Sequence, residues 1–228
     1  MLYQILYTIF DRFSDLILRF TGNLVVLAGP FKGMSYIHGA VGSSLIPKIL
    51  GTYEKELSGW IAELPQFKVG LDVGAAEGYY AVGFLNRNTC DRVIAWEMDP
   101  KGQVLMENLA QANGMSDRLE IRGHCDCEEL GRTIAAATTG PILLVSDCEG
   151  FEGPLLEPLL ADQVGKCFIL LETHEPMNPG VHGRLREKLA VTHDILEVYP
   201  KRRLSCDIPS KLPGLLKLLA LPVLRRLA

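Results

Sequence analysis

The sequence predicts an α/β protein built on a doubly wound, mostly parallel sheet. From residue 68 onward, short apolar runs alternate with segments that have helical character. These runs are apolar almost throughout, which is typical of strands in a sheet that helices cover on both faces. The chain has 228 residues, of which 48% are hydrophobic and 22% are charged, so it can form one such domain with extensions.

The first 66 residues form an N-terminal extension in this interpretation. Apolar residues at helical spacing predict an amphipathic helix over residues 1–20. Residues 24–37 resemble two short strands around the turn "AGPFKG". Residues 43–64 are expected to be helical and to end before Pro65.

Residues 67–208 are expected to form the α/β domain. Its strands are predicted at 68–73, 92–98, 118–123, 141–147, 166–172 and 193–200. Its helices are predicted at 79–87, 100–114, 127–137, 154–164 and 182–190. Gly114 ends the second of these helices, and the fourth is expected to be a broken helix.

Residues 209–228 form a Leu-rich basic tail, which Pro213 and Pro222 divide into short helices. The two apolar ends of the chain have two interpretations. They pack on the domain or on a second copy in a homodimer, or they make a peripheral membrane contact with basic residues toward anionic headgroups. The N-terminus lacks the features of a signal peptide, and no uninterrupted apolar stretch is long enough to span a membrane.

The cysteine content indicates a cytoplasmic protein, with a membrane-peripheral location as the alternative. The net charge of −4 is spread along the chain, so nucleic acid is not the expected partner. The six cysteines include no CxxC pair and are interpreted as reduced structural thiols. A metal site at the CxC of Cys125 and Cys127 would lack a second ligand pair.

The stretch "LDVGAAEGYYAVG" places Gly74 and Gly78 directly after the first strand of the domain. Ligands of doubly wound sheets bind outside the carboxyl ends of the strands. Small residues there let the backbone approach a ligand and expose N–H groups at the start of the next helix. Glu97 closes the second strand, where its carboxylate can accept both hydroxyls of a ribose. Together these features predict an adenosine-type cofactor.

The loop favours S-adenosylmethionine over a dinucleotide. The dinucleotide pattern G-x-G-x-x-G would need glycines where Ala76 and Tyr79 stand. Asp72, just before the loop, suits a cofactor with cationic groups better than one with two phosphates. Asp126 is expected to accept from the adenine amino group, and Asp147 to lie beside the sulfonium. The predicted cofactor-binding residues are Asp72, Gly74, Ala75, Ala76, Gly78, Tyr79, Glu97, Met98, Asp126, Cys127 and Asp147.

Four motifs carry a resemblance to a known family. They are "LDVGAAEGYYAVGF", "VIAWEMDP", "LLVSDCEGFEGPLLEPLL" and "FILLETHEP". They resemble the strand-end motifs of Rossmann-like S-adenosylmethionine-dependent methyltransferases, and the D-x-E-G-x-E run resembles the FkbM-type family in particular. The resemblance covers about residues 68–175 and implies O-methylation of sugars or natural products. The Leu-rich ends of the chain add a lipid-linked acceptor as a hypothesis. Ala76, Glu77 and Met98 depart from the family pattern, so the resemblance bears on cofactor binding more than on the acceptor.

Methyl transfer to a hydroxyl needs a base, and the candidates are Asp147, Glu172 and His174. The acceptor would be a small molecule or a glycan. The same three residues could instead hold Mg²⁺, which would lower the pKa of the acceptor hydroxyl. Glu149 and Glu152 are interpreted as partly structural, because acids after a tight turn can cap the next helix.

The region before the sheet is expected to cover the cofactor or to shape the acceptor pocket. Tyr53 and Glu54 are the candidates there, and His38 is interpreted as a turn residue. Two other functions stay open. An NAD-dependent oxidoreductase would need the missing third glycine, and no Tyr-x-x-x-Lys pair is present. A non-catalytic nucleoside-binding module would keep the fold and lose the site.

Overall fold

The computed structural model describes residues 24–137, 140–201, 203–204 and 207. The chain divides into two compact units, Met1–Leu64 with Val198–Ala228, and Pro65–Glu197. The expected helix over residues 1–20 and the expected tail over 209–228 lie outside the described residues.

A parallel sheet of five strands forms the centre of the larger unit, as predicted. Its strands are β3 (Phe67–Val73), β4 (Cys90–Trp96), β5 (Leu119–Arg122), β6 (Ile142–Ser146) and β7 (Cys167–Leu171). They lie in the order β5-β4-β3-β6-β7, and each neighbouring pair is parallel. The chain therefore leaves β3 toward one side of the sheet and returns to its other side at β6, which is the arrangement of a doubly wound fold.

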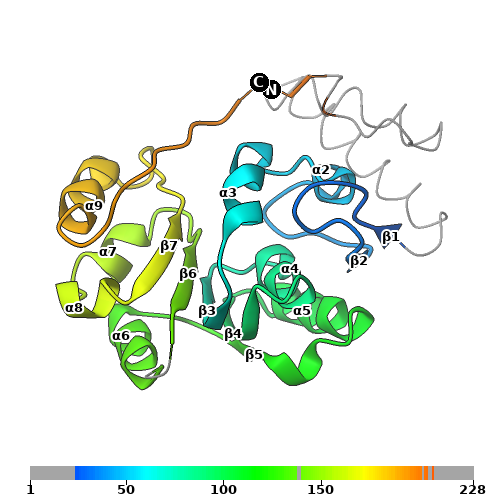
Figure 1. Cartoon of the computed structure of the whole chain (residues 1–228), viewed down its shortest axis with the longest axis horizontal. Coiled ribbons are helices and arrows are strands. Elements are labelled where there is room, and N and C mark those ends of the chain that lie inside the picture. The colour runs from blue at the N-terminus through cyan, green and yellow to red at the C-terminus, as the bar shows by residue number, and fades with distance from the viewer. Residues whose placement is uncertain (1–23, 138–139, 202, 205–206, 208–228) are drawn as a thin grey trace. The chain divides into compact units, whose positions relative to one another are not determined.

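Helices cover both faces of this sheet (Figure 1). One face carries α4 (Tyr79–Asn86) and α5 (Pro100–Ala112). The other carries α6 (Cys127–Ala136), α7 (Glu152–Leu156), α8 (Ala161–Val164) and α9 (Val181–Leu189). A short 3-10 helix, η2 (Ser116–Arg118), precedes β5. The prediction of an α/β, doubly wound sheet is confirmed.

Strand alternation determines which side chains each helical layer receives. Val69, Leu71 and Val73 pack into the apolar core beneath α6, α7, α8 and α9. Successive side chains of a strand point to opposite faces, so Gly70 and Asp72 face the layer of α4 and α5. Asp72, a polar residue near the end of the buried strand β3, therefore lies under the first turn of α4.

Short polar signals fix the helix ends. Asp99 caps α5 by accepting from the Lys101 N–H at 2.9 Å, and Pro100 occupies the first helical position. Asp126 caps α6 by accepting from the Glu129 N–H at 2.8 Å. Gly114, with a φ of 67°, follows the end of α5 as expected.

Two expected elements differ from the structure. The helix expected over residues 43–64 is divided into α2 (Leu45–Leu50), the 3-10 helix η1 (Lys55–Leu57) and α3 (Ser58–Glu63). The break comes at Gly51, which has a φ of 71° and lies so close to the backbone that an added Cβ would be 1.9 Å from the Ala28 carbonyl oxygen.

The strand expected over residues 193–200 is also wrong, because this segment has no regular structure. Its apolar residues do not alternate strictly with polar ones, as Ile195 and Leu196 are adjacent. Glu197 instead bonds the Arg186 guanidinium of α9 at 2.8 Å. The segment thus follows α9 and does not extend the sheet.

The smaller unit contains the expected hairpin. Strand β1 (Leu24–Val25) pairs antiparallel with β2 (Ser35–Tyr36). Arg203 is buried, forms an ion pair with Glu56 and donates to the Thr52 carbonyl oxygen at 2.9 Å. This pair joins the C-terminal residues of the unit to its helical segment.

The described cysteines are all free thiols, in agreement with the prediction. Burial raises the pKa of four of these thiols to about 12, namely Cys90, Cys125, Cys148 and Cys167. Within the described part of the chain, no helix has both the length and the apolar character needed to cross a lipid bilayer.

Candidate active site

The loops that follow β3, β4, β6 and β7 lie at the carboxyl edge of the sheet, where the sequence placed the site. The β3 loop and the β6 loop are in direct contact. The Asp147 N–H donates to the Val73 carbonyl oxygen at 3.0 Å, and the Gly74 backbone packs against the Asp147 carbonyl. Because β3 and β6 lie at the position where the chain changes direction across the sheet, this edge is the expected ligand position of a doubly wound fold.

The loop from Gly74 to Gly78 is held by backbone hydrogen bonds. The N–H groups of Gly74 and Ala75 both donate to the Trp96 carbonyl oxygen at 3.0 Å, and the Gly78 N–H donates to the Ala75 carbonyl oxygen at 2.8 Å. Ala76 has a φ of 50°, a conformation that non-glycine residues seldom adopt. The loop is thus a fixed turn that leads into α4.

Contacts within the protein explain why Gly74 and Gly78 are glycines, and the sequence did not indicate these contacts. A Cβ at Gly74 would lie 1.8 Å from the Asp147 carbonyl oxygen, and a Cβ at Gly78 would lie 2.6 Å from Met106 Cγ. Both glycines also have positive φ, at 84° and 89°. The missing side chains therefore make room for protein atoms at these two positions, where the sequence interpretation had placed a ligand.

Glu97 follows β4 and turns back toward this loop. Its Oε2 accepts from the Ala76 N–H at 2.8 Å, and its Oε1 accepts from the Asp99 N–H at 2.7 Å. Each oxygen of an ionised carboxylate can accept a second hydrogen bond. Glu97 is therefore fixed in position by the backbone while it retains acceptor capacity on both oxygens for a pair of vicinal hydroxyls.

Asp72 is a buried carboxyl beneath the loop, with 4% of its surface exposed. The Ala81 N–H of α4 donates to it, whereas its Oδ2 is buried with no hydrogen-bond partner among the described residues. Burial, the negative charge of Asp147 and that of Glu97 raise the pKa of Asp72 to about 7. A positive charge placed near this edge would favour the ionised form of Asp72.

The remaining predicted cofactor-binding residues differ widely in exposure. Tyr79 begins α4 and, like Ala75, is buried, whereas Met98 is 71% exposed. Asp126 is exposed and accepts from the backbone at the start of α6, which lowers its pKa. Cys127, the first residue of α6, is half-buried. One oxygen of Asp126 is therefore committed to the helix cap, a role that the sequence interpretation did not give it.

A histidine and three acids converge where β6 and β7 end. His174 Nδ1 lies 2.7 Å from Glu152 Oε1. On the other side of the ring, Nε2 lies 3.6 Å from Asp147 Oδ1 and 3.5 Å from Glu149 Oε2. The structure thus brings together two of the three predicted catalytic residues, Asp147 and His174.

The acids determine the charge of this histidine. Burial lowers the pKa of His174, but the hydrogen bond and charge of Glu152, with the charges of Asp147 and Glu172, outweigh burial. The net effect raises the pKa of His174 above its ordinary value of 6.5. The imidazole is therefore a stronger base than a free histidine.

Glu172 acts on His174 through its charge, which helps to raise the pKa of the imidazole. It is exposed, and its backbone N–H still pairs with the Ser146 carbonyl oxygen at 3.0 Å, so it continues the ladder of β7 with β6. The residues that sequence reasoning undervalued are Glu149 and Glu152, both within the D-x-E-G-x-E run that was quoted for the family resemblance. Their spacing from Asp147 was the available signal.

The metal alternative named Asp147, Glu172 and His174, but the structure gathers a different set. Asp147, Glu149 and His174 each offer an atom within 4.8 Å of the others. Mg²⁺ prefers six oxygen ligands in regular geometry, and imidazole is a poor ligand for it. The donor set suits Mg²⁺ poorly, and we interpret these residues through proton transfer.

Two other expectations concern residues of the smaller unit. Tyr53 lies beneath the Lys48 ammonium, with Nζ 4.9 Å from the ring centroid, and Glu54 precedes η1 with a φ of 41°. His38 is exposed. An acceptor-binding role for Tyr53 and Glu54 stays a prediction.

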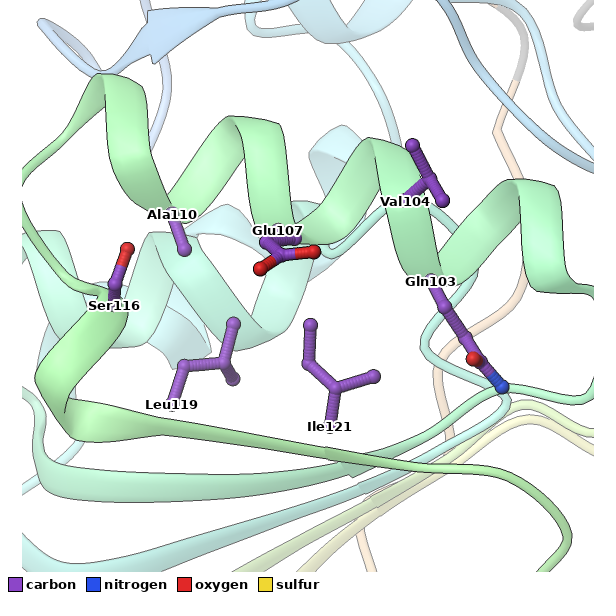
Figure 2. A pocket seen from close by; sticks show the side chains of 7 residues that line it. All are labelled: Gln103, Val104, Glu107, Ala110, Ser116, Leu119 and Ile121. Carbon is purple, nitrogen blue, oxygen red and sulfur yellow. The ribbon is translucent and has the colours of Figure 1, made fainter.

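A groove of about 330 Å³ lies elsewhere, between α5 and the edge strand β5 (Figure 2). Leu119 and Ile121 point from β5 toward α5, which contributes Gln103 and Glu107 among others. None of the predicted site residues lines this groove. Its connection to the carboxyl edge is Gln103, whose amide donates to the Glu97 carbonyl oxygen at 2.7 Å.

Comparison with known proteins gives similarity at the level of the fold. No family profile matches the sequence, and no curated protein matches it. Among solved structures, a protein of the NADB-Rossmann superfamily from Streptococcus agalactiae is similar, with 18% identity, a TM-score of 0.44, and coverage of 61% of this chain and 58% of that chain.

Two further structures with a similar fold are methyltransferases. A tRNA methyltransferase from B. subtilis has 16% identity and a TM-score of 0.44, with coverage of 60% of this chain and 55% of that chain. An O-methyltransferase from Bacillus cereus, in complex with SAH, has 18% identity and a TM-score of 0.37, with coverage of 55% of this chain and 63% of that chain. This chain therefore spans less than two thirds of the length of each of these three structures.

Proposed function

We propose that the protein is an S-adenosylmethionine-dependent methyltransferase that methylates a hydroxyl group. The observation that carries this proposal is the gathering of three carboxylates, Asp72, Glu97 and Asp147, around the loop after β3. Glu97 is bonded to that loop through the Ala76 N–H, and Asp147 packs against it through its carbonyl. A negative site of this kind attracts a cation and repels a pyrophosphate.

The residues present suit the cofactor in two respects. Glu97 offers acceptor capacity on both oxygens for the two hydroxyls of a ribose. The buried Oδ2 of Asp72 and the nearby Asp147 favour a positively charged group at the loop. When bound, S-adenosylmethionine supplies a methyl group on a positively charged sulfur. A nucleophile in line with the C–S bond can attack the methyl carbon, and the sulfur is the leaving group.

His174 is the base in this proposal. It takes the proton of the acceptor hydroxyl at Nε2 while the new C–O bond forms and the C–S bond breaks, so that the methyl ether and S-adenosylhomocysteine are the products. Base catalysis of this kind contributes about 10²–10⁴-fold to a rate. Alignment of the acceptor with the methyl group is the other expected contribution.

The acceptor is proposed to be a sugar or natural-product hydroxyl on the basis of the family resemblance, or a lipid-linked hydroxyl on the basis of the Leu-rich ends of the sequence. The arrangement of His174 supports a hydroxyl as the nucleophile, because a hydroxyl must lose its proton to react at neutral pH. Radiolabelled S-adenosylmethionine incubated with pooled acceptors of these classes would identify the one that receives the label.

Cofactor binding is tested first, by thermal shift and calorimetry on the full chain. We expect S-adenosylhomocysteine to stabilise the protein and NAD to have no effect. Glu97→Ala should weaken binding of S-adenosylhomocysteine about 10–100-fold, because hydrogen bonds to a charged group contribute about 1.5–3 kcal/mol. Glu107→Ala, which removes an exposed acid of α5, is the matched control and should bind as the wild type does.

The outcomes separate the three functions considered from the sequence. Stabilisation by NAD alone would favour an oxidoreductase. Binding of S-adenosylhomocysteine without transfer of label to any pooled acceptor would favour a nucleoside-binding module. No stabilisation by either compound would remove the basis of the proposal.

A further inference from the structure

Glu152 is a fully buried acid at the first position of α7. Its side chain has 0% exposure. Buried carboxylates are rare unless they are paired, because removal of a carboxylate from water is unfavourable. Glu152 Oε1 accepts from the Gly150 N–H at 3.0 Å and lies 2.7 Å from His174 Nδ1.

The surrounding backbone holds this pair in place. Gly150 has a φ of 100°, and a Cβ there would lie 2.6 Å from Met177 Cβ. The Asn178 amide also donates to the Gly150 carbonyl oxygen at 3.4 Å. The loop after β6 is therefore packed tightly against the loop after β7, which contains His174. A small shift of either loop would break the contact between Glu152 and the imidazole.

A carboxylate at Nδ1 determines the protonation pattern of the ring. An ionised carboxylate only accepts hydrogen bonds, so Nδ1 must carry the proton. Nε2 is then the position that gains and loses a proton, and it is directed toward Asp147 and Glu149. Both distances exceed a direct hydrogen bond, so neither acid holds Nε2 in such a bond.

We propose that Glu152 is a positioning residue for His174, because its buried carboxylate holds the Nδ1–H tautomer and directs Nε2 to the acceptor hydroxyl. This inference rests on the proposed function. The proton of the hydroxyl passes to Nε2, the ring becomes an imidazolium, and Glu152 stays ionised and stabilises that positive charge. Glu152 gains no proton and does not touch the acceptor.

A purely structural role for Glu152 explains less. Helix α7 has Phe151 at its N-cap and no side-chain cap hydrogen bond, so Glu152 does not serve as the cap. Its Oε2 is buried with no hydrogen-bond partner among the described residues. A neutral glutamine could make the same contacts at lower desolvation cost. The negative charge of Glu152 stabilises a positive imidazole, which a neutral glutamine cannot do.

Nuclear magnetic resonance of the ¹⁵N-histidine-labelled full chain tests this inference without any substrate. The chain has five histidines, and a His174→Gln sample identifies the signals of His174. In the wild type we expect the Nδ1–H tautomer at high pH. Glu152→Gln keeps the shape and the acceptor oxygen, so the tautomer should persist while the pKa of His174 falls.

The control variant is Glu157→Gln, which makes the same glutamate-to-glutamine change at the end of α7. Glu157 follows α7 and forms an ion pair with Arg184 at 2.9 Å. Glu157→Gln should leave the pKa of His174 unchanged. The other acids that face His174 are Asp147, Glu149 and Glu172, and all three are retained in both variants.

The failure of this inference can be separated from the failure of the proposed function. An unchanged His174 pKa in folded Glu152→Gln, or an Nε2–H tautomer in the wild type, would overturn the positioning role. Absence of S-adenosylhomocysteine binding by the wild type would overturn the proposed function and is measured independently. With an identified acceptor, Glu152→Gln should lower kcat and leave the affinity for S-adenosylhomocysteine unchanged.

Discussion

Replacement of Asp72 by asparagine removes a carboxyl that the folded protein holds in an unfavourable place. In the unfolded chain this group ionises near its ordinary pKa of 3.8, whereas in the folded protein its pKa is about 7. The folded state therefore binds a proton that the unfolded state has already lost between these two values. Stability falls as pH rises whenever the folded state holds more protons, so Asp72 makes the protein less stable toward neutral pH.

The size of the effect follows from the difference between the two pKa values. Each pKa unit corresponds to about 1.36 kcal/mol. Below pH 5 most of the loss of unfolding free energy caused by Asp72 has not yet occurred. This loss is nearly complete at pH 8, which is above the folded-state pKa of about 7. Between pH 5 and pH 8 the wild type should lose about 3 kcal/mol of unfolding free energy through Asp72 alone.

Asparagine has nearly the same shape and does not titrate, so Asp72→Asn isolates this contribution. Urea unfolding followed by circular dichroism gives the unfolding free energy of both proteins at a series of pH values. The difference between Asp72→Asn and the wild type should grow in favour of the variant by about 3 kcal/mol from pH 5 to pH 8. Saturating S-adenosylmethionine should reduce this growth, because a cation beside Asp72 favours the ionised carboxylate.

Asp91→Asn is the control for this experiment. Asp91 is the second residue of β4 and lies beside the Lys68 ammonium, which lowers the pKa of Asp91. The contribution of Asp91 to stability is therefore lost only as pH falls below the ordinary range of its pKa. The difference in unfolding free energy between Asp91→Asn and the wild type should therefore stay constant between pH 5 and pH 8. A flat curve for Asp72→Asn as well would refute the reasoning, since Asp72 would then be ionised in the folded protein at pH 5.

Three further predictions test the site. Gly74→Ala should destabilise the protein by more than about 2 kcal/mol, because it combines positive φ with a 1.8 Å contact to the Asp147 carbonyl. Gly114→Ala, with a φ of 67° and open space around it, should cost only about 1 kcal/mol, and equal losses would contradict the packing argument. Asp126→Ala should lower the urea midpoint through loss of the α6 cap, and an unchanged urea midpoint would contradict that role. Because the folded-state pKa of His174 is raised above 6.5, its protonation stabilises the protein at lower pH, and this contribution is lost as pH rises through the raised value. His174→Gln should therefore be less stable than the wild type at pH 6, with a gap that narrows by pH 8, and a pH-independent gap would count against the pairing with Glu152.

The sheet and its site edge could be predicted because they depend on local patterns. Buried parallel strands are apolar throughout, and acids that follow such strands necessarily meet at one edge. The position of Glu97 beside the loop after β3 was predicted in this way, since it needs only the count of residues from the loop. The same reasoning located His174 and Asp147 at the ends of β7 and β6.

The remaining features depend on contacts between distant segments. The break at Gly51 arises from its approach to the Ala28 backbone, which no local helix signal reveals. Glu152 and His174 are 22 residues apart, and their contact depends on how two loops pack at the ends of β6 and β7. The sequence showed Glu172 and His174 two positions apart, but only the structure shows that Glu172 remains exposed beside the ladder.

The buried thiols have a practical consequence for spectroscopy. Alkylating dyes react with thiolates, and a thiol with a pKa of about 12 is almost entirely protonated at pH 7. Cys90, Cys125, Cys148 and Cys167 should therefore resist maleimide labels in the native state. Among the five described thiols, Cys127, half-buried at the start of α6, then becomes the attachment point for a fluorophore near the carboxyl edge, and Cys206, outside the described residues, would be replaced first.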